Sequence, residues 1–206
     1  MSLFKKERNK AIVNFIDIDN GSAQLASSGE LNGEAGQRIV YDSQAQINSL
    51  EQQGYVLEKN NFNPNGETPF FGKQTEYIIS FKHQKIAITH PDEKSGITSA
   101  DLKKVGQQIV HYDGAANRTP QDSVNQVVFR RTVLVDRVTG QKKMQPWQPA
   151  EQNFLMVSTP EIPGYIAQHA YVGGESVTPL DCNRNYEVTY EINHAPSSNQ
   201  QKVEIK

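Results

Sequence analysis

Three short features occur twice along the chain in the same order, and this repetition constrains the fold more than any other property of the sequence. They are an Asp placed four residues before a Gly, a Gly-Tyr pair, and a Tyr followed four residues later by an aromatic residue. The copies are FIDIDNG (Phe15–Gly21) and LVDRVTG (Leu134–Gly140), Gly54-Tyr55 and Gly164-Tyr165, and Tyr77–Phe81 and Tyr186–Tyr190. The spacing between the second and third features is 22 residues in one copy and 21 in the other. The repetition predicts two related units that meet near residue 84.

The first unit has the pattern strand, turn, strand, helix, strand, strand. A strand is expected over residues 10–18, ending at the turn signal Asp19-Asn20-Gly21. A helix is expected over residues 42–53, because Asp42 or Ser43 can cap its first turn and Gly54 stops it. Joined through this helix, the first and last strands should pair in parallel. The predicted core consists of Val13, Phe15, Ile39, Ile47, Leu50, Val56, Ile79 and Phe81.

The second unit carries more strand and less helix. Its long β-branched run at residues 124–138 must bend or serve two sheets, and it should form a hairpin with residues 142–147 through Thr139-Gly140. A short helical turn is expected over residues 98–104. Further strands are expected at residues 85–89, 107–112, 154–158, 165–170 and 186–192.

These patterns predict an α+β fold made of two tandem β-rich domains in an elongated arrangement. Residues 1–84 should form a ubiquitin-like β-grasp domain, in which one helix lies on a mixed sheet. Residues 85–195 should form a related but more strand-rich domain, and residues 196–206 a polar linker.

Composition excludes several classes of protein. Lys and Arg number 21 against 23 Asp and Glu, so the chain has no basic surface excess for nucleic acid. No segment approaches the roughly 18 apolar residues of a membrane-spanning helix, and the first residues lack the apolar stretch of a signal peptide. A single cysteine, Cys182, excludes an internal disulfide and predicts a small loop or strand residue. Catalytic patterns are absent, so an enzyme is not expected.

The chain resembles a known group of proteins over nearly its whole length. Residues 11–83 are similar to the mucin-binding protein (MucBP) domain family, through IDIDNG, GQRI (Gly36–Ile39), LEQQGY (Leu50–Tyr55) and TEYIISFKH (Thr75–His83). Residues 109–167 resemble the companion domain of the long repeats in lactobacillal mucus-binding surface proteins. The matching segments there are Ile109–Gly140, the lone Trp147 and FLMVSTPEIPGYIA (Phe154–Ala167).

The resemblance implies a non-catalytic adhesive repeat, monomeric within a tandem array on a cell-wall-anchored protein outside the cell. Its partners would be host mucin glycoproteins, recognised through their glycan chains. An immunoglobulin bound through a sheet edge is one alternative partner, and a passive spacer role is the other alternative. Neither nucleic acid nor membrane insertion is expected.

Three residues are candidates for glycan binding. Arg130 and Arg131 are expected inside one strand, so only one of them should face a given ligand, where it can pair with a carboxylate or sulfate on a mucin glycan. The alternative for this basic pair is protection of a sheet edge or a local salt bridge. Trp147 can stack on a sugar ring, or it can anchor its loop in the core.

One segment resembles the start of a calcium loop. Asp17, Asp19 and Asn20 have the spacing of the first ligands, but the later positions lack the expected glycine and glutamate. The plainer interpretation is a hairpin turn after a strand, and no cofactor is required. The five histidines show no metal-ligand spacing and are expected to be satisfied surface or strand residues, with a pH-tuned role as the alternative.

Overall fold

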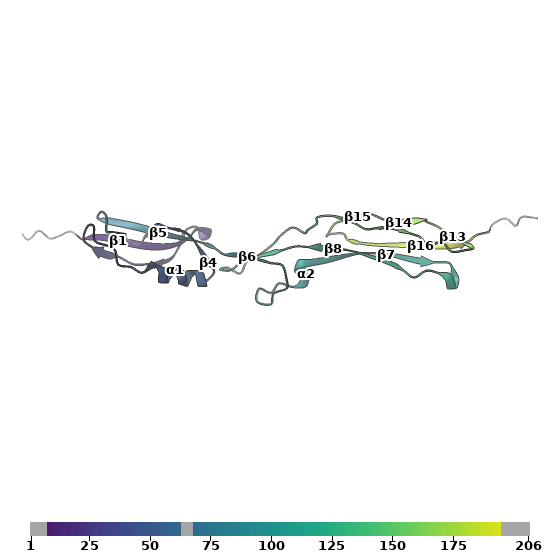
Figure 1. Ribbon diagram of the computed structural model, residues 1–206, viewed down its shortest axis with the longest axis horizontal. Coiled ribbons are helices and arrows are strands. Elements are labelled where there is room, and N and C mark those ends of the chain that lie inside the picture. Colours follow the sequence, from purple (N-terminus) through teal and green to yellow (C-terminus); the bar gives the residue numbers. More distant parts are fainter. Residues whose placement is uncertain (1–7, 63–67, 195–206) are drawn as a thin grey trace, which may run out of the picture. The chain divides into compact units, whose positions relative to one another are not determined.

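The computed structural model describes residues 8–62 and 68–194, which form two compact units (Figure 1). The first unit takes in the chain up to Ile88 together with Val133–Lys143, and the second takes in Thr89–Thr132 and the chain from Met144 onward. The first unit is therefore discontinuous in sequence, where the sequence analysis expected one boundary near residue 84. The predicted linker at residues 196–206 lies outside the described residues. Within the described residues, no helix has the length and apolar character needed to cross a membrane.

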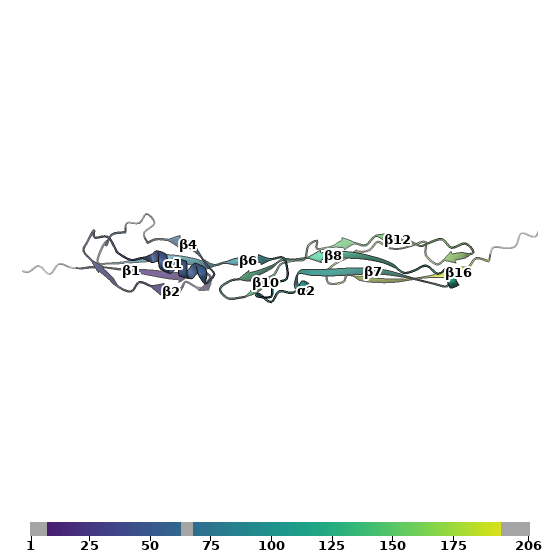
Figure 2. The same cartoon turned by 60° about the horizontal axis from the view of Figure 1, so that its bottom comes forward.

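The first unit is a mixed sheet with one helix. Its strand order is β2-β1-β5-β4, with β3 paired to β1, and the central strands β1 and β5 run parallel as predicted. Figure 2 shows α1 lying along the sheet. The elements are β1 (Asn9–Asp17), the 3-10 turn η1 (Ile18–Asn20), β2 (Ala23–Ser27), β3 (Leu31–Gly33), α1 (Ser43–Gln52), β4 (Tyr55–Asn60) and β5 (Gln74–His83).

Helix α1 begins and ends where the sequence predicts. The Asp42 carboxylate accepts hydrogen bonds from the backbone N–H groups of Gln44 and Ala45 at 3.0 and 3.3 Å, which caps the first turn. The chain leaves the helix through Gly54, whose φ of +99° is one that side-chain-bearing residues rarely adopt. Ile47 and Leu50 are buried on the face that packs against the sheet.

The core of the first unit contains the predicted residues with one exception. Val56 is only half-buried, whereas Phe62 and Phe70 join the core without having been predicted. Phe70 lies directly over Gly33, where an added Cβ would come within 2.1 Å of the ring. Phe62 follows the end of β4 and Phe70 precedes β5, so neither showed a strand or helix period.

A three-stranded sheet completes the first unit, in the order β10-β9-β6. It is formed by β6 (Lys85–Ile88), β9 (Val133–Asp136) and β10 (Lys142–Met144). The β9–β10 pair confirms the predicted hairpin. The run at residues 124–138 does serve two sheets, because its first part forms β8 (Ser123–Arg130) in the second unit and its last part forms β9.

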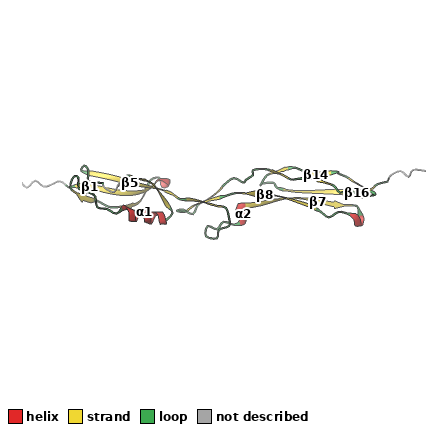
Figure 3. Ribbon diagram, in the orientation of Figure 1, coloured by secondary structure: helices red, strands yellow, loops and turns green. Residues whose placement is uncertain are grey.

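The second unit has a four-stranded sheet in the order β13-β16-β7-β8, with β7 and β16 parallel. Short strand pairs, β11 with β15 and β12 with β14, pack against this sheet instead of a long helix (Figure 3). The elements are α2 (Ser99–Leu102), β7 (Lys103–Asp113), the 3-10 turn η2 (Ala116–Arg118), β11 (Gln152–Asn153), β12 (Met156–Ser158), β13 (Tyr165–Ala167), β14 (Tyr171–Gly173), β15 (Ser176–Val177) and β16 (Asn183–Ile192).

Two of the three repeated features mark equivalent strands. Tyr77 lies opposite Val13 in the parallel pair of the first unit, and Tyr186 lies opposite Val110 in that of the second. The Gly-Tyr pairs open β4 and β13, which run antiparallel to the closing strand in each unit. The first feature was misread, because Asp136 ends β9 rather than β7, the strand equivalent to β1.

Candidate functional site

The two predicted arginines line one hollow of about 430 Å³ in the second unit. Strand β8 ends at Arg130, so Arg131 lies beyond it and strand alternation does not separate the two side chains. The two arginines therefore do not both lie inside one strand, and the alternation argument for only one of them facing a ligand does not apply. The remaining lining of the hollow is largely polar: Thr89, Leu102, Thr132, Gln145, Pro146 and Gln148.

Trp147 contacts one residue of this hollow, Arg131, and also packs on the core. The ring is half-buried and packs against the cluster that contains Phe129 and Phe154. The guanidinium of Arg131 lies 4.2 Å from the centre of the Trp147 ring, a cation–π contact, and its Nε donates to the Asp101 carbonyl at 2.6 Å. Arg131 is thus held in place, and Trp147 packs on the core in the way expected of a loop anchor.

Arg130 has a fixed backbone and an exposed side chain. Its N–H donates to the Gln148 carbonyl at 2.9 Å, and the Gln148 N–H donates back to the Arg130 carbonyl at 2.6 Å. This pairing fixes the hollow where β8 ends. A guanidinium here presents a planar fork of donors that matches a carboxylate or sulfate, so the arrangement suits an anionic group.

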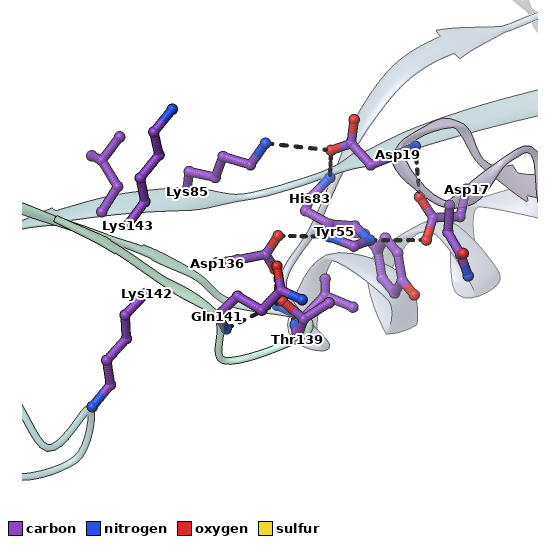
Figure 4. A pocket seen from close by; sticks show the side chains of 13 residues that line it. Asp17, Asp19, Tyr55, His83, Lys85, Asp136, Thr139, Gln141, Lys142 and Lys143 are labelled. Atoms are coloured by element: carbon purple, nitrogen blue, oxygen red, sulfur yellow. Dashed lines mark hydrogen bonds and ion pairs between the residues drawn. The ribbon is translucent and has the colours of Figure 1, made fainter. Parts of the chain in front are cut away.

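The most elaborate polar cluster lies in the first unit and centres on His83 (Figure 4). His83 Nε2 lies 2.9 Å from Asp17 Oδ2 and His83 Nδ1 lies 2.7 Å from Asp136 Oδ2. The His83 and Asp17 side chains are 7% and 3% exposed, and that of Asp136 is 12% exposed. These residues end β5, β1 and β9, so the cluster joins the hairpin at Val133–Lys143 to the main sheet of the first unit.

The geometry indicates a doubly protonated ring. Both ring nitrogens face carboxylate oxygens, which accept hydrogen bonds when ionised, and only the imidazolium donates from both nitrogens. Burial by itself favours the neutral ring, but the hydrogen bonds and charges of Asp17 and Asp136 outweigh it and raise the pKa of His83 above 6.5.

The pKa of the Asp136 carboxyl is shifted downward, opposite to the shift of His83. Burial alone would raise its pKa, but the backbone N–H groups of Thr139 and Val138 and the His83 ring hold the pKa of Asp136 below 3.8. The outcome is a largely buried cluster in which each ring nitrogen of His83 has a carboxylate partner. It lies at one side of a hollow of about 640 Å³, which Lys85, Gln141 and Tyr55 also line.

The sequence contained a signal for this cluster. The Asp-to-Gly spacing was noted at both Asp17 and Asp136 and attributed to repetition, although the two aspartates meet at one histidine. His83 is a satisfied strand histidine, as the default prediction had it, but its two carboxylate partners were not predicted. Its partners lie 66 and 53 residues away, a separation that no local pattern reports.

The predicted calcium residues lie in a hairpin turn. Asp17 Oδ1 accepts from the Asp19 N–H at 3.0 Å, Asp19 Oδ2 accepts from the His83 N–H at 3.0 Å, and Asn20 is exposed. The chain then turns through Gly21 into β2, as the plainer interpretation had it. Among the described residues, no group of three or more His, Cys, Asp and Glu side chains is arranged to hold a metal ion.

Cys182 is a small core residue. It is 4% exposed, packs with Val127 and Phe129, and its Sγ lies 3.9 Å from the Val105 carbonyl oxygen. This agrees with the predicted role as a small structural residue.

Comparison with known families matches both units. Residues 9–83 match the model of a mucin binding domain, and residues 97–194 match that of a Muc B2-like domain. The second match includes the hairpin at Val133–Lys143, so Asp136 comes from the segment of one family and His83 from that of the other. No curated protein sequence matches the chain.

Two solved structures share the arrangement of elements. The crystal structure of Mub-RV is 27% identical, with a TM-score of 0.68 over 88% of this chain and 97% of that one. The type 2 repeat of the mucus binding protein MUB from Lactobacillus reuteri is 26% identical, with a TM-score of 0.52 over 90% of this chain and 100% of that one.

The fold and the two matches define the class of this protein as paired β-rich domains of adhesion type. The chain belongs to the two-domain mucus-binding repeats, with a mucin binding domain followed by a Muc B2-like domain. These families are binding domains of surface adhesins rather than enzymes.

Proposed function

We propose that the chain is a non-catalytic adhesive repeat that binds the glycan chains of mucin through acidic groups held at Arg130. The membership in the mucus-binding repeats supports the mucin partner. The single observation that supports the site is the hollow beside Arg130 and Arg131, where one guanidinium is stacked on Trp147 and the other is exposed.

The chemistry of the hollow suits a sialic-acid carboxylate or a sulfate ester. Arg130 supplies a bidentate charged donor, and the side-chain amides of Gln145 and Gln148 supply neutral hydrogen bonds to sugar hydroxyls. The cation–π contact limits the freedom of Arg131, which lowers the entropy lost on binding. One site of this kind is weak, and many copies on one surface raise the effective concentration.

The proposal places the repeat outside the cell, in a protein anchored to the cell wall. A calcium role for Asp17, Asp19 and Asn20 is a separate proposal, and a calcium titration monitored by the amide spectrum of the turn tests it.

The test is retention of mucin on the immobilised chain. Arg130→Gln should lower retention about tenfold, the loss expected for one charge-assisted contact, and sialidase or desulfation of the mucin should have the same effect. Arg38→Gln is the matched control, since Arg38 is an exposed arginine of the first unit. Unchanged retention by Arg130→Gln would contradict the proposed site.

A parallel measurement separates the alternatives. Retention of immunoglobulin with no retention of mucin would favour the sheet-edge partner instead. If two copies of the chain joined in tandem retain neither mucin nor immunoglobulin, the result favours the passive spacer role.

A further inference from the structure

A second hollow, of about 600 Å³, lies in the second unit between the loop Pro160–Gly164 and strands β12, β13 and β14. Three tyrosines line it, Tyr165, Tyr171 and Tyr190, and we call it the tyrosine pocket. Its volume falls within the range of about 300–1,000 Å³ that is usual for small-ligand sites. None of these residues belongs to the hollow beside Arg130.

The loop that forms one wall is held rigidly. The hydroxyl of Tyr190 donates to the Pro160 carbonyl at 2.7 Å, and Arg118 Nη1 donates to the Pro163 carbonyl at 3.0 Å. The Asn193 N–H donates to the Gly164 carbonyl at 2.9 Å. A short loop with two prolines that is fixed from β16 and η2 is pre-organised, which reduces the entropy lost when a ligand binds.

The rest of the lining is largely aromatic. Tyr171 lies opposite Ser158 in the β12–β14 pair, and the Thr159 N–H extends that pairing to the Ala170 carbonyl at 2.9 Å. Tyr171 is nevertheless 63% exposed, while Tyr190 is 3% exposed and Tyr165 packs against the core. The core thus fixes two of the rings, and the third lies open to solvent on a paired strand.

The charge of the pocket differs from that of the arginine hollow. Among the described residues that line it, Glu161 carries the only formal charge. A carboxylate accepts hydrogen bonds from sugar hydroxyls and repels an acidic sugar. Ser158 adds a hydroxyl to the polar part of the lining, whereas the hydroxyl of Thr159 donates to the His169 carbonyl at 2.6 Å.

We propose that the tyrosine pocket is a second glycan subsite, which binds an uncharged pyranose ring against Tyr171 with its hydroxyls directed to Glu161. A pyranose has an apolar face of C–H groups that packs on an aromatic ring and a rim of hydroxyls that needs acceptors, and the pocket offers both. This inference rests on the proposed function and adds a substrate class to it. Each repeat would bind a neutral sugar and an acidic group at two separate sites.

The test is an amide NMR titration of the whole chain with N-acetyllactosamine, a neutral disaccharide. Saturable shifts are expected at Gly164, Tyr165 and Tyr171 in the millimolar range. Tyr171→Ala should weaken binding about tenfold, whereas Tyr171→Phe keeps the ring and should bind as the native chain does. Phe71→Ala, which removes an aromatic ring that is 79% exposed in the first unit, is the matched control and should change nothing.

The outcomes separate this inference from the proposed function. Absence of saturable shifts in the pocket, or equal affinity of Tyr171→Ala, would overturn the inference even if Arg130→Gln still lost mucin. Shifts caused by an unglycosylated proline-rich peptide and not by the disaccharide would also overturn it, in favour of a peptide groove. Retention of the disaccharide by Arg130→Gln, with lost retention of acidic mucin, would support two separate subsites.

Discussion

Each unit has its own sheet, and the two sheets have the same strand arrangement but are covered by different elements. In the first the strand order is β2-β1-β5-β4 and in the second it is β8-β7-β16-β13, each with a parallel central pair and antiparallel neighbours. The first sheet is covered by α1, through Ile47 and Leu50. The second is covered by short strand pairs, through residues such as Phe154 and Val177. The parallel central pair is therefore the common feature of the two units. A helix or short strand pairs can cover the sheet, provided that they supply apolar side chains to the core.

The units also differ where the first strand of the parallel pair ends. In the first unit this position is Asp17, buried in the ion cluster with His83. In the second it is Gly114, which follows β7 and lies so close to the Tyr190 backbone that an added Cβ would come within 2.3 Å of its carbonyl oxygen. One unit thus uses charge to attach a distant hairpin, and the other uses the absence of a side chain to bring two strand ends together.

The largest effect is expected from removing the charge at the centre of the cluster. His83→Gln leaves two buried carboxylates without a cation, which should lower the free energy of unfolding of the first unit by about 3 kcal/mol. The helix band in circular dichroism follows the first unit, which contains α1, and fluorescence of the single tryptophan, Trp147, follows the second.

The control for this substitution lies in the other unit. His111 Nδ1 lies 2.8 Å from Asp122 Oδ1, a distance similar to those at His83, but the two side chains are 59% and 47% exposed. His111→Gln should change stability by less than about 1 kcal/mol, because exposed ion pairs contribute little. Equal effects of the two substitutions would show that burial is not what distinguishes the two histidines.

The next largest effect is expected from filling the glycine position of the second unit. Gly114 has a φ of +91°, so Gly114→Ala combines an unfavourable backbone conformation with a clash against Tyr190. The free energy of unfolding of the second unit should fall by about 2 kcal/mol, measured by Trp147 fluorescence. Gly164→Ala in the same unit, at a φ of +87° with no atom within 4 Å of its Cβ position, isolates the cost of backbone conformation.

The smallest effect is expected from pH, because deprotonation of His83 keeps the ring in place. The raised pKa of His83 gives stability that is fully present below about pH 6.5 and is lost as the pH rises through the folded-state pKa. The lowered pKa of Asp136 gives stability that is present above about pH 3.8 and is lost as the pH falls through its folded-state pKa. The stability of the first unit should therefore decline relative to the second between neutral and alkaline pH, and His83→Gln should abolish that decline in a thermal-unfolding series.

The sequence predicted the elements whose patterns are local. Helix α1 was predicted because Asp42 and Gly54 mark its ends, and the closing strands β5 and β16 because Tyr77 and Tyr186 recur with nearly the same spacing. The strand pairs β11–β15 and β12–β14 were largely missed, because strands of two or three residues are too short to show a period. The two arginines and Trp147 were predicted as candidates, but the hollow was not, since it depends on where β8 ends. The tyrosine pocket depends on hydrogen bonds to carbonyl groups, which sequence does not encode locally.

The discontinuity of the first unit has a consequence for how the chain is made. Its main sheet is complete in sequence at His83, yet the carboxylate of Asp136 that satisfies the second nitrogen of that histidine emerges from the ribosome 53 residues later. Until then the first unit exists without β9 and β10, and His83 has one partner. Closure of so long a loop adds entropy cost and slows folding. Folding of the first unit can therefore be completed only after residues 89–132 of the second unit have been synthesised.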